Sequence, residues 1–285
     1  MKYLNLNLVH KLVKNAIRED LGDKDWTTDI FVSRKLEGQA LIVSREPGVV
    51  AGLPMVRDVF GYVSRAIRVD FLKPDGSRIK ADTPIAKVAG PLHSILKGER
   101  VALNFLGHLS GIASKTRQFV DQVKPYPVKI MDTRKTLPLL RVLEKYAVRC
   151  GGGFNHRMNL TEAIMIKDNH LEAVDYNWKR IANRLKKVRG KEIIIEIDRL
   201  EMLEKGIELA PDVILLDNMT VEQVKAAVAK VRASKKKIQI EISGRVTLTT
   251  VRDYAKTGAD RISVGAITHS APRFDFSLEM SPRRK

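Results

Sequence analysis

The sequence has a single cysteine, and this scarcity excludes several kinds of structure. Among 285 residues only Cys150 carries a thiol. One thiol can form neither an internal disulfide nor a multi-cysteine metal site, so the fold must depend on its hydrophobic core. We interpret Cys150 as a small buried residue rather than a catalytic nucleophile, although His156 is close to it in sequence.

Long apolar runs are also missing. None approaches the roughly 18 residues that a membrane-spanning helix requires. The first twenty residues, MKYLNLNLVHKLVKNAIRED, carry charges throughout and do not resemble a secretory signal. We therefore expect a cytoplasmic protein with no membrane partner.

Acidic residues are outnumbered by basic ones, which gives a formal net charge of +18 at pH 7. Such an excess can attract nucleic acid, an anionic membrane or an acidic small substrate. The basic residues are dispersed along the chain and mostly interleaved with Glu and Asp, and we interpret the short runs SKKKIQ (234–239) and SPRRK (281–285) as solvated surface. A basic nucleic-acid-binding protein is therefore only a remote alternative.

The first hundred residues predict a small α+β domain. Apolar positions keep helical spacing over 8–21, and Gly22 follows where a glycine would end the helix. Short β-branched runs within 39–52 and 67–90 are separated by Pro-Gly and Pro-Asp-Gly turns, which is typical of antiparallel strands. Two helical segments are predicted within 97–123, interrupted near Ser110 and Gly111.

We place the domain junction at that interruption. The predicted domains are an N-terminal α+β sandwich over 1–110, an α/β barrel over 111–270, and a C-terminal segment over 271–285 that returns to the N-terminal domain.

Strand and helix alternate after the junction. The candidate strands are VKIMD, AIMIKD, EIIIEID, VILLDN, IQIEIS and RISVGA, with helical patterns between them, as at 221–233 and 247–257. Strands apolar throughout and joined by helices indicate a parallel sheet that is covered on both faces. An open doubly wound sheet is possible, but no G-x-G-x-x-G follows the first strand, and the glycines of CGGGFNH follow a helix. We favour a (β/α) barrel.

Polar residues gather where these strands end, as in AIMIKDNH (163–170). A barrel builds its active site from such strand ends. The residues expected to meet there are Arg134, Lys135, Lys167, Glu196, Asp198, Asp217 and Ser243.

The residue types at these ends indicate the chemistry. Glu196 and Asp217 suit Mg²⁺ shared with an oxygen-rich ligand, although each could simply pair with a Lys or Arg. Alternation places Asp198 on the same face as Glu196, so either could be the metal-side carboxylate. The basic residues of MDTRKT (131–136) and GGGFNHR (151–157) suit an anion that carries carboxylates.

Glycines follow the last two strands, in EISGRVT (241–247) and ISVGAITHS (262–270). Backbone N–H groups at such positions bind phosphate, and late strands are the usual phosphate position in a barrel. We expect a phosphorylated substrate.

The stretch MDTRKTLPLLRVLEKYAVRCGGGFNHRMNLTEAIMIKDNHL (131–171), with GERVALNFLGHLSGIAS upstream and EIDRLEML, VILLDN, EISG and ISVGAITHS downstream, closely resembles the quinolinate phosphoribosyltransferases. The resemblance covers nearly the whole chain. It implies an incomplete α/β barrel beside the N-terminal sandwich domain. It also implies an enzyme of de novo NAD synthesis that converts quinolinate and phosphoribosyl pyrophosphate into nicotinate mononucleotide, pyrophosphate and carbon dioxide with Mg²⁺.

The resemblance also implies a role for each matching residue. Quinolinate would be held by Arg134, His156, Arg157, Lys167 and, from a partner subunit, Arg100. The phosphates would be bound by Lys135, Ser243, Gly244, Gly265 and His269. Glu196 and Asp217 would hold Mg²⁺, and the catalytic set would be Lys135, Lys167, Glu196 and Asp217. The family forms dimers or larger assemblies of dimers, such as a hexamer.

One position departs from the family pattern. Arg245 stands after Ser243 and Gly244, where the family usually has Gly or Asn, and it could contact phosphate or point to solvent. A related phosphoribosyltransferase that acts on another aromatic acid, such as nicotinate, is the alternative function. The choices between dimer and hexamer and between Mg²⁺ and Mn²⁺ stay open.

Overall fold

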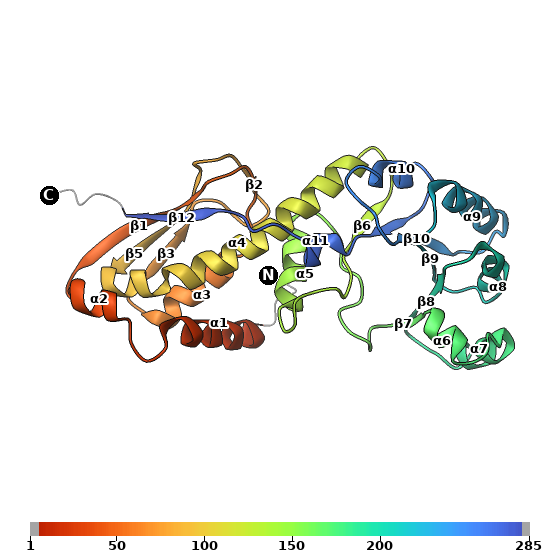
Figure 1. Ribbon diagram of the computed structural model, residues 1–285, viewed down its shortest axis with the longest axis horizontal. Helices are drawn as coiled ribbons and strands as arrows, with labels where there is room; N and C mark the ends of the chain where they lie inside the picture. The colour runs from red at the N-terminus through yellow and green to blue at the C-terminus, as the bar shows by residue number, and fades with distance from the viewer. Residues whose placement is uncertain (1–5, 281–285) are drawn as a thin grey trace. The chain divides into compact units, whose positions relative to one another are not determined.

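The computed structural model describes residues 6–280, which form two compact units (Figure 1). The first contains the chain up to Arg117, Pro138–Gly152 and the chain from Ala271 onward; the second contains Gln118–Leu137 and Gly153–Ser270. The basic run 281–285 lies outside the described residues. Within 6–280, no helix is long and apolar enough to cross a membrane.

The first unit is an antiparallel sheet with helices. Its elements are α1 (Leu6–Leu21), α2 (Trp26–Phe31), β1 (Glu37–Ser44), β2 (Gly48–Val49), α3 (Leu53–Val63), β3 (Arg68–Phe71), β4 (Arg78–Ile79), β5 (Pro84–Pro91), α4 (Leu92–Val123), α5 (Arg141–Cys150) and β12 (Phe276–Met280). The main sheet has the order β12-β1-β5-β3, and β2 pairs with β4. All of these pairs are antiparallel, as the turn signals predicted for the strands before α4.

The opening helix shows how spacing becomes packing. On α1 the side chains of Val9, Val13 and Ile17 repeat at four-residue intervals, and each is 1% exposed. They form the face that packs toward α3. The helix ends at Gly22, whose φ of +51° is readily adopted by glycine.

The predicted interruption at Ser110 and Gly111 is wrong, because α4 is one helix of 32 residues. Both residues have packing roles instead. The Ser110 hydroxyl donates to Ala51 O and accepts from Ala51 N, at 3.1 and 3.0 Å. A Cβ on Gly111 would overlap the carbonyl oxygen of Pro272. The small residues that suggested a break therefore allow neighbouring chain to approach the helix closely.

The second unit is built on a parallel sheet. Its elements are β6 (Lys129–Met131), β7 (Ala163–Ile166), α6 (Asp168–Glu172), α7 (Trp178–Leu185), β8 (Glu192–Ile197), a 3₁₀ turn (Leu200–Met202), α8 (Leu203–Glu208), β9 (Val213–Asp217), α9 (Val221–Ala233), β10 (Gln239–Ser243), α10 (Val251–Ala255), β11 (Arg261–Ser263) and α11 (Ala266–His269). All six predicted strands are present.

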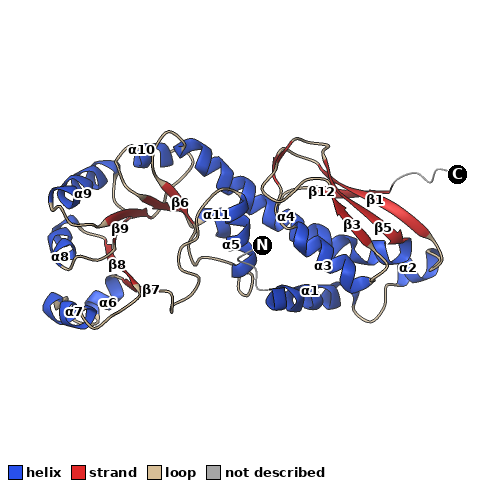
Figure 2. Cartoon of the chain, turned by 180° about the vertical axis from the view of Figure 1, so that it is seen from behind, coloured by secondary structure: helices blue, strands red, loops and turns tan. Residues whose placement is uncertain are grey.

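The strand order shows an incomplete barrel, which confirms the predicted fold class. The order is β6-β11-β10-β9-β8-β7, and every neighbouring pair is parallel. The first strand in sequence, β6, pairs with the last, β11, as in a closed barrel, but β6 and β7 are edge strands. Helices α8, α9 and α10 lie outside the curved sheet (Figures 1 and 2).

Apolar side chains fill the lower part of the barrel interior. Ala163, Ile194, Val213 and Leu215 form one buried cluster, with Met165 packed against it. These residues come from β7, β8 and β9 and alternate with residues that face the covering helices. The interior is therefore solid at this level, and polar groups can collect only nearer the carboxyl ends of the strands.

The close packing of α4 makes a stability prediction. Gly111→Ala should lower the free energy of unfolding by about 1–3 kcal/mol, because its methyl group must displace the backbone at Pro272. The matched control is Gly61→Ala in α3, where an added Cβ meets nothing within 4 Å. That variant should be neutral or slightly stabilising. Denaturant unfolding of both variants checks this, and equal stabilities would contradict it.

Candidate active site

A cavity of about 780 Å³ opens at the carboxyl ends of the barrel strands, and all of its lining residues belong to the second unit. Four predicted carboxylate-binding residues line it: Arg134, His156, Arg157 and Lys167. Five predicted phosphate-binding residues line it too: Lys135, Ser243, Gly244, Gly265 and His269. Glu196 and Asp217 complete the predicted set. Parallel strands bring these residues together because all their carboxyl ends face the same edge.

Two guanidinium groups meet in this cavity. Burial lowers the pKa of Arg157, and the positive charge of Arg134 lowers it further. Arg157 is oriented from below, because its Nη1 donates to Ala163 O at 3.1 Å and its Nη2 contacts Met165 Sδ at 3.6 Å. Like charges repel each other, and an anion that contacts both guanidinium groups would relieve that repulsion.

The carboxylates lie across from these cations. Glu196 is 8% exposed and accepts a hydrogen bond from Lys167 Nζ. Burial raises the pKa of Glu196 above the ordinary carboxyl range; the hydrogen bond from Lys167 lowers it, and the negative charge of Asp217 raises it again. Glu196 and Asp217 are thus close enough to repel one another, so an added cation would stabilise both as carboxylates.

Asp198 lies elsewhere. It is exposed, falls after the end of β8 and pairs with Arg199, its Oδ1 lying 3.7 Å from Arg199 Nε. It does not line the cavity, so of the two candidate carboxylates only Glu196 faces the site. Alternation along β8 failed to separate them because the strand ends at Ile197.

The two glycines of the predicted phosphate site lie in closely packed backbone. A Cβ on Gly244 would overlap the Asn218 side chain and lie 2.8 Å from Asn218 N, so only glycine fits. At the other late strand, a Cβ on Gly265 would lie 3.2 Å from both the His269 ring and Lys135 Cδ.

Lys135 is held in place by its own backbone. Its carbonyl accepts a hydrogen bond from Thr268 Oγ1 at 2.6 Å, and its N–H donates to Thr133 Oγ1 at 3.1 Å. The lysine is therefore fixed to α11 before any ligand binds.

Sequence reasoning missed Glu241. This residue of β10 is fully buried, lines the cavity and accepts a hydrogen bond from Ser263 Oγ. His156 Nε2 lies 3.4 Å from its Oε1. Alternation supplied the signal, because Glu241 is two residues before Ser243 on the same strand face. The carboxyl group of Glu241 therefore lies beside the imidazole of His156.

Other candidates lie away from the cavity lining. Arg100 is an exposed residue of α4, and its approach from a partner subunit stays a prediction. Cys150 is partly buried rather than fully buried, and burial together with the charge of Asp75 raises its thiol pKa to about 12. A thiol with so high a pKa is a poor nucleophile.

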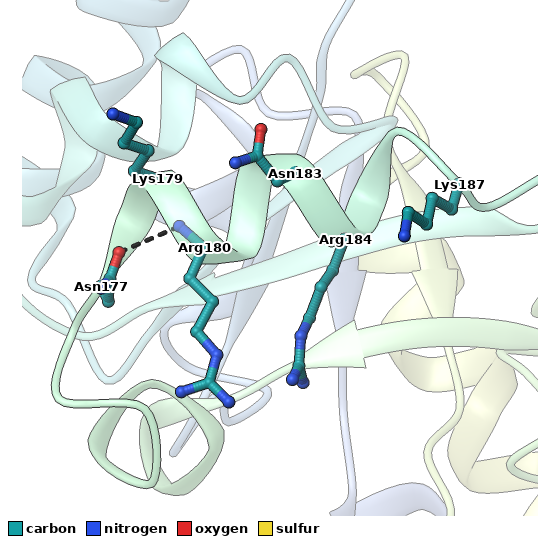
Figure 3. Close-up of a pocket in the computed structure, with 6 residues that line it drawn as sticks. All are labelled: Asn177, Lys179, Arg180, Asn183, Arg184 and Lys187. Atoms are coloured by element: carbon teal, nitrogen blue, oxygen red, sulfur yellow. Dashed lines mark hydrogen bonds between the residues drawn. The ribbon is translucent and has the colours of Figure 1, made fainter.

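A second, shallower hollow lies over α7 (Figure 3). Its lining consists of four cations and two amides: Lys179, Arg180, Arg184, Lys187, Asn177 and Asn183. The Asn177 side chain accepts from Arg180 N at 2.9 Å and so caps the helix (Figure 3). The lining contains no carboxylate and no nucleophile. The carboxylates and the predicted ligand-binding residues thus line the barrel cavity and not this hollow.

Family models match most of the chain. The model described as "Quinolinate phosphoribosyl transferase, N-terminal domain" matches residues 25–110, and the model of the C-terminal domain matches 112–279. A protein named as a probable nicotinate-nucleotide pyrophosphorylase (carboxylating) from Synechocystis is 41% identical over 96% of this chain and 92% of its own length. The one from Mycobacterium leprae is 39% identical, with 94% and 95% covered.

A solved structure agrees with the sequence comparison. The nicotinate-nucleotide pyrophosphorylase from Francisella tularensis superposes with a TM-score of 0.92 at 34% identity, covering 98% of both chains. Both compact units are therefore matched, in sequence and in fold. This chain belongs to the quinolinate phosphoribosyl transferase family.

Proposed function

We propose that this chain transfers the phosphoribosyl group of phosphoribosyl pyrophosphate to quinolinate and releases carbon dioxide, giving nicotinate mononucleotide and pyrophosphate for de novo NAD synthesis. The family and the names of its members support this reaction. The structural observation that supports it most directly is the pair of guanidinium groups, Arg134 and Arg157, in one cavity.

Quinolinate is a planar dianion, and the cavity supplies matching donors. A guanidinium offers two parallel N–H groups to a carboxylate. We assign the two carboxylates to Arg134, Arg157 and Lys167, with His156 beside them. The existing bond between Lys167 and Glu196 then sets where the ring lies relative to the acidic side of the cavity.

The phosphoribosyl donor would occupy the late-strand side. We assign its phosphates to Lys135, His269 and the N–H groups near Gly244 and Gly265. The two carboxylates Glu196 and Asp217 fit Mg²⁺, which binds one or two carboxylates together with substrate oxygens. Within 6–280 no group of three or more His, Cys, Asp or Glu residues could hold a metal ion. When bound with the donor, Mg²⁺ would supply charge that stabilises the leaving pyrophosphate.

The reaction needs alignment more than acid–base chemistry. The pyridine nitrogen attacks the anomeric carbon with its own lone pair while the bond to pyrophosphate breaks, so no base is required. Lys135 neutralises charge on the leaving group. In the quaternary product the C2–carboxylate bond breaks, the electron pair stays on C2 beside the positive nitrogen, and C2 then takes up a proton. Arg134 and Arg157 hold the ring throughout.

A measurement of carbon dioxide release tests this function against the nicotinate alternative. With quinolinate labelled at the C2 carboxyl group, label should leave as carbon dioxide in equal amount to the nicotinate mononucleotide formed. Product from nicotinate without release from quinolinate would establish the alternative.

Loss of either guanidinium should weaken quinolinate use specifically. Arg134→Ala and Arg157→Ala should each lower kcat/KM for quinolinate by about 10²-fold or more, because a carboxylate of the bound quinolinate loses its guanidinium partner. Steady-state kinetics with circular dichroism checks activity and fold together. Arg184→Ala on α7 is the matched control and should behave as wild type; wild-type turnover in either cavity variant would defeat the assignment.

Removal of a metal-side carboxylate should change the requirement for Mg²⁺. Asp217→Asn and Glu196→Gln should each raise the Mg²⁺ concentration for half-maximal rate by about tenfold or more. Asp198→Asn, which removes a carboxylate outside the cavity, should leave it unchanged. Titration of the initial rate with Mg²⁺ compares the three, and a larger effect in Asp198→Asn would reverse the assignment.

We further propose that Arg100 completes the quinolinate site of a partner subunit in a cytoplasmic homodimer or hexamer. Neither Arg100→Ala nor Lys135→Ala alone should be active, but hybrid dimers of the two contain one intact site. Mixing them should therefore restore about half of the wild-type activity per hybrid dimer, and about a quarter in a random equimolar mixture, because about half of its dimers are hybrids. Subunit exchange is verified by mass spectrometry of differently labelled chains. Exchange without recovered activity would count against a shared site.

A further inference from the structure

Arg245 stands on the wall of the cavity in a backbone conformation that is unfavourable for arginine. Its φ is +45°, in the left-handed region where a Cβ crowds the backbone. It is one of several non-glycine residues with positive φ, but among those at described positions it alone lines the barrel cavity. A strained residue that persists at such a place is a candidate for a functional role.

The neighbouring backbone enforces this conformation. Gly244 has φ of +90° and is packed against Asn218. Asn218 N donates to Ser243 O at 3.0 Å, and Asn218 Nδ2 donates to Asp217 Oδ2 at 2.6 Å, which ties the ends of β9 and β10 together. On the other side Val246 is only 6% exposed. Residue 245 is fixed between a tied turn and a buried side chain, so it cannot relax locally.

The guanidinium of Arg245 is available for a ligand. Its side chain is exposed, and within residues 6–280 it has neither a hydrogen bond nor an ion pair. Its neighbours Ser243 and Thr247, which also line the cavity, offer hydroxyl groups. The side chain of Lys135 lies next to Gly265, the glycine that follows the other late strand. Among the lining residues that run from Ser243 to Thr247, the cation is Arg245.

We propose that Arg245 binds the 5′-phosphate of phosphoribosyl ligands and so raises the affinity of this enzyme for its donor and its product. The inference rests on the proposed function and adds a residue to it. A guanidinium gives a forked pair of hydrogen bonds to phosphate, which hydroxyls and backbone N–H groups alone do not provide. The strained backbone at residue 245 then lowers the stability of the protein but positions the guanidinium at the phosphate.

The central experiment compares Arg245→Gly with wild type. Glycine adopts positive φ readily, so the variant should be more stable while it binds phosphate less well. Calorimetric titration with nicotinate mononucleotide should give a Kd about 10- to 100-fold higher. The KM for phosphoribosyl pyrophosphate should rise similarly, the Kd for quinolinate should not change, and the Tm should increase.

Lys235→Gly is the matched control. Lys235 is also an exposed cation with positive φ, at +56°, but it follows α9 and does not line the cavity. This variant should gain stability like Arg245→Gly, with wild-type affinity for nicotinate mononucleotide. Arg245→Lys keeps the charge but not the fork, and its Kd should fall between those of wild type and Arg245→Gly.

Three outcomes would overturn the inference. An equal Kd for nicotinate mononucleotide in Arg245→Gly and wild type would mean that Arg245 does not contact the phosphate. A loss confined to pyrophosphate binding would place Arg245 at the leaving group instead. Equal losses in Lys235→Gly would reduce the effect to net charge. If the wild-type protein makes no nicotinate mononucleotide, the proposed function fails. Titration of wild type and Arg245→Gly with inorganic phosphate then still tests whether Arg245 binds phosphate.

Discussion

Repulsion between like charges is the constraint on which this site depends. Burial lowers the pKa of Arg157, and Arg134 is close enough for its positive charge to lower that pKa further. Glu196 and Asp217 repeat the arrangement with the opposite sign. Because Arg134 lies near Arg157 and Glu196 lies near Asp217, ligands that bring the opposite charge to each pair are favoured in this cavity. An anion with two carboxylates and a phosphorylated donor with its metal ion meet that requirement.

The barrel fold stays stable although like charges lie close together at the carboxyl ends of its strands. Glu196 and Asp217 lie on the neighbouring strands β8 and β9, whose ladder hydrogen bonds fix their backbones, whereas Arg134 and Arg157 lie in the loops that follow β6 and α5. Below them Ile194, Val213 and Leu215 are packed without polar atoms. The strands can therefore stay in register while their ends repel, because folding free energy comes from the apolar layer. Repulsion between the charged side chains at the strand ends lowers the folding stability, and the same side chains bind the ligands.

The sequence predicts the sheet well because its signals are local. Each barrel strand is a short run rich in apolar residues, and each predicted run proved to be a strand. The polar residues predicted to meet at the ends of these runs, except Asp198, line one cavity, since the carboxyl ends of parallel strands face the same edge. The assignment of roles to those residues came from family resemblance, and those roles stay predictions.

The failures depended on information that is not local. Ser110 and Gly111 resemble a helix break, but their neighbours Ala51 and Pro272 are distant in sequence and decide that the helix continues. Asp198 was not separated from Glu196 because the end of a strand varies by a residue or two. Glu241 was overlooked because a carboxylate inside an apolar strand is tolerated only beside partners such as Ser263, which belong to another strand.

The central claim is that the cavity recognises a dianion through paired cations. Calorimetric titration of wild-type protein with quinolinate and with nicotinate, at two salt concentrations, tests it most directly. The account predicts tighter binding of quinolinate, by about tenfold or more, and a steeper loss of that affinity with added salt. Equal affinities for the dicarboxylate and the monocarboxylate would contradict it.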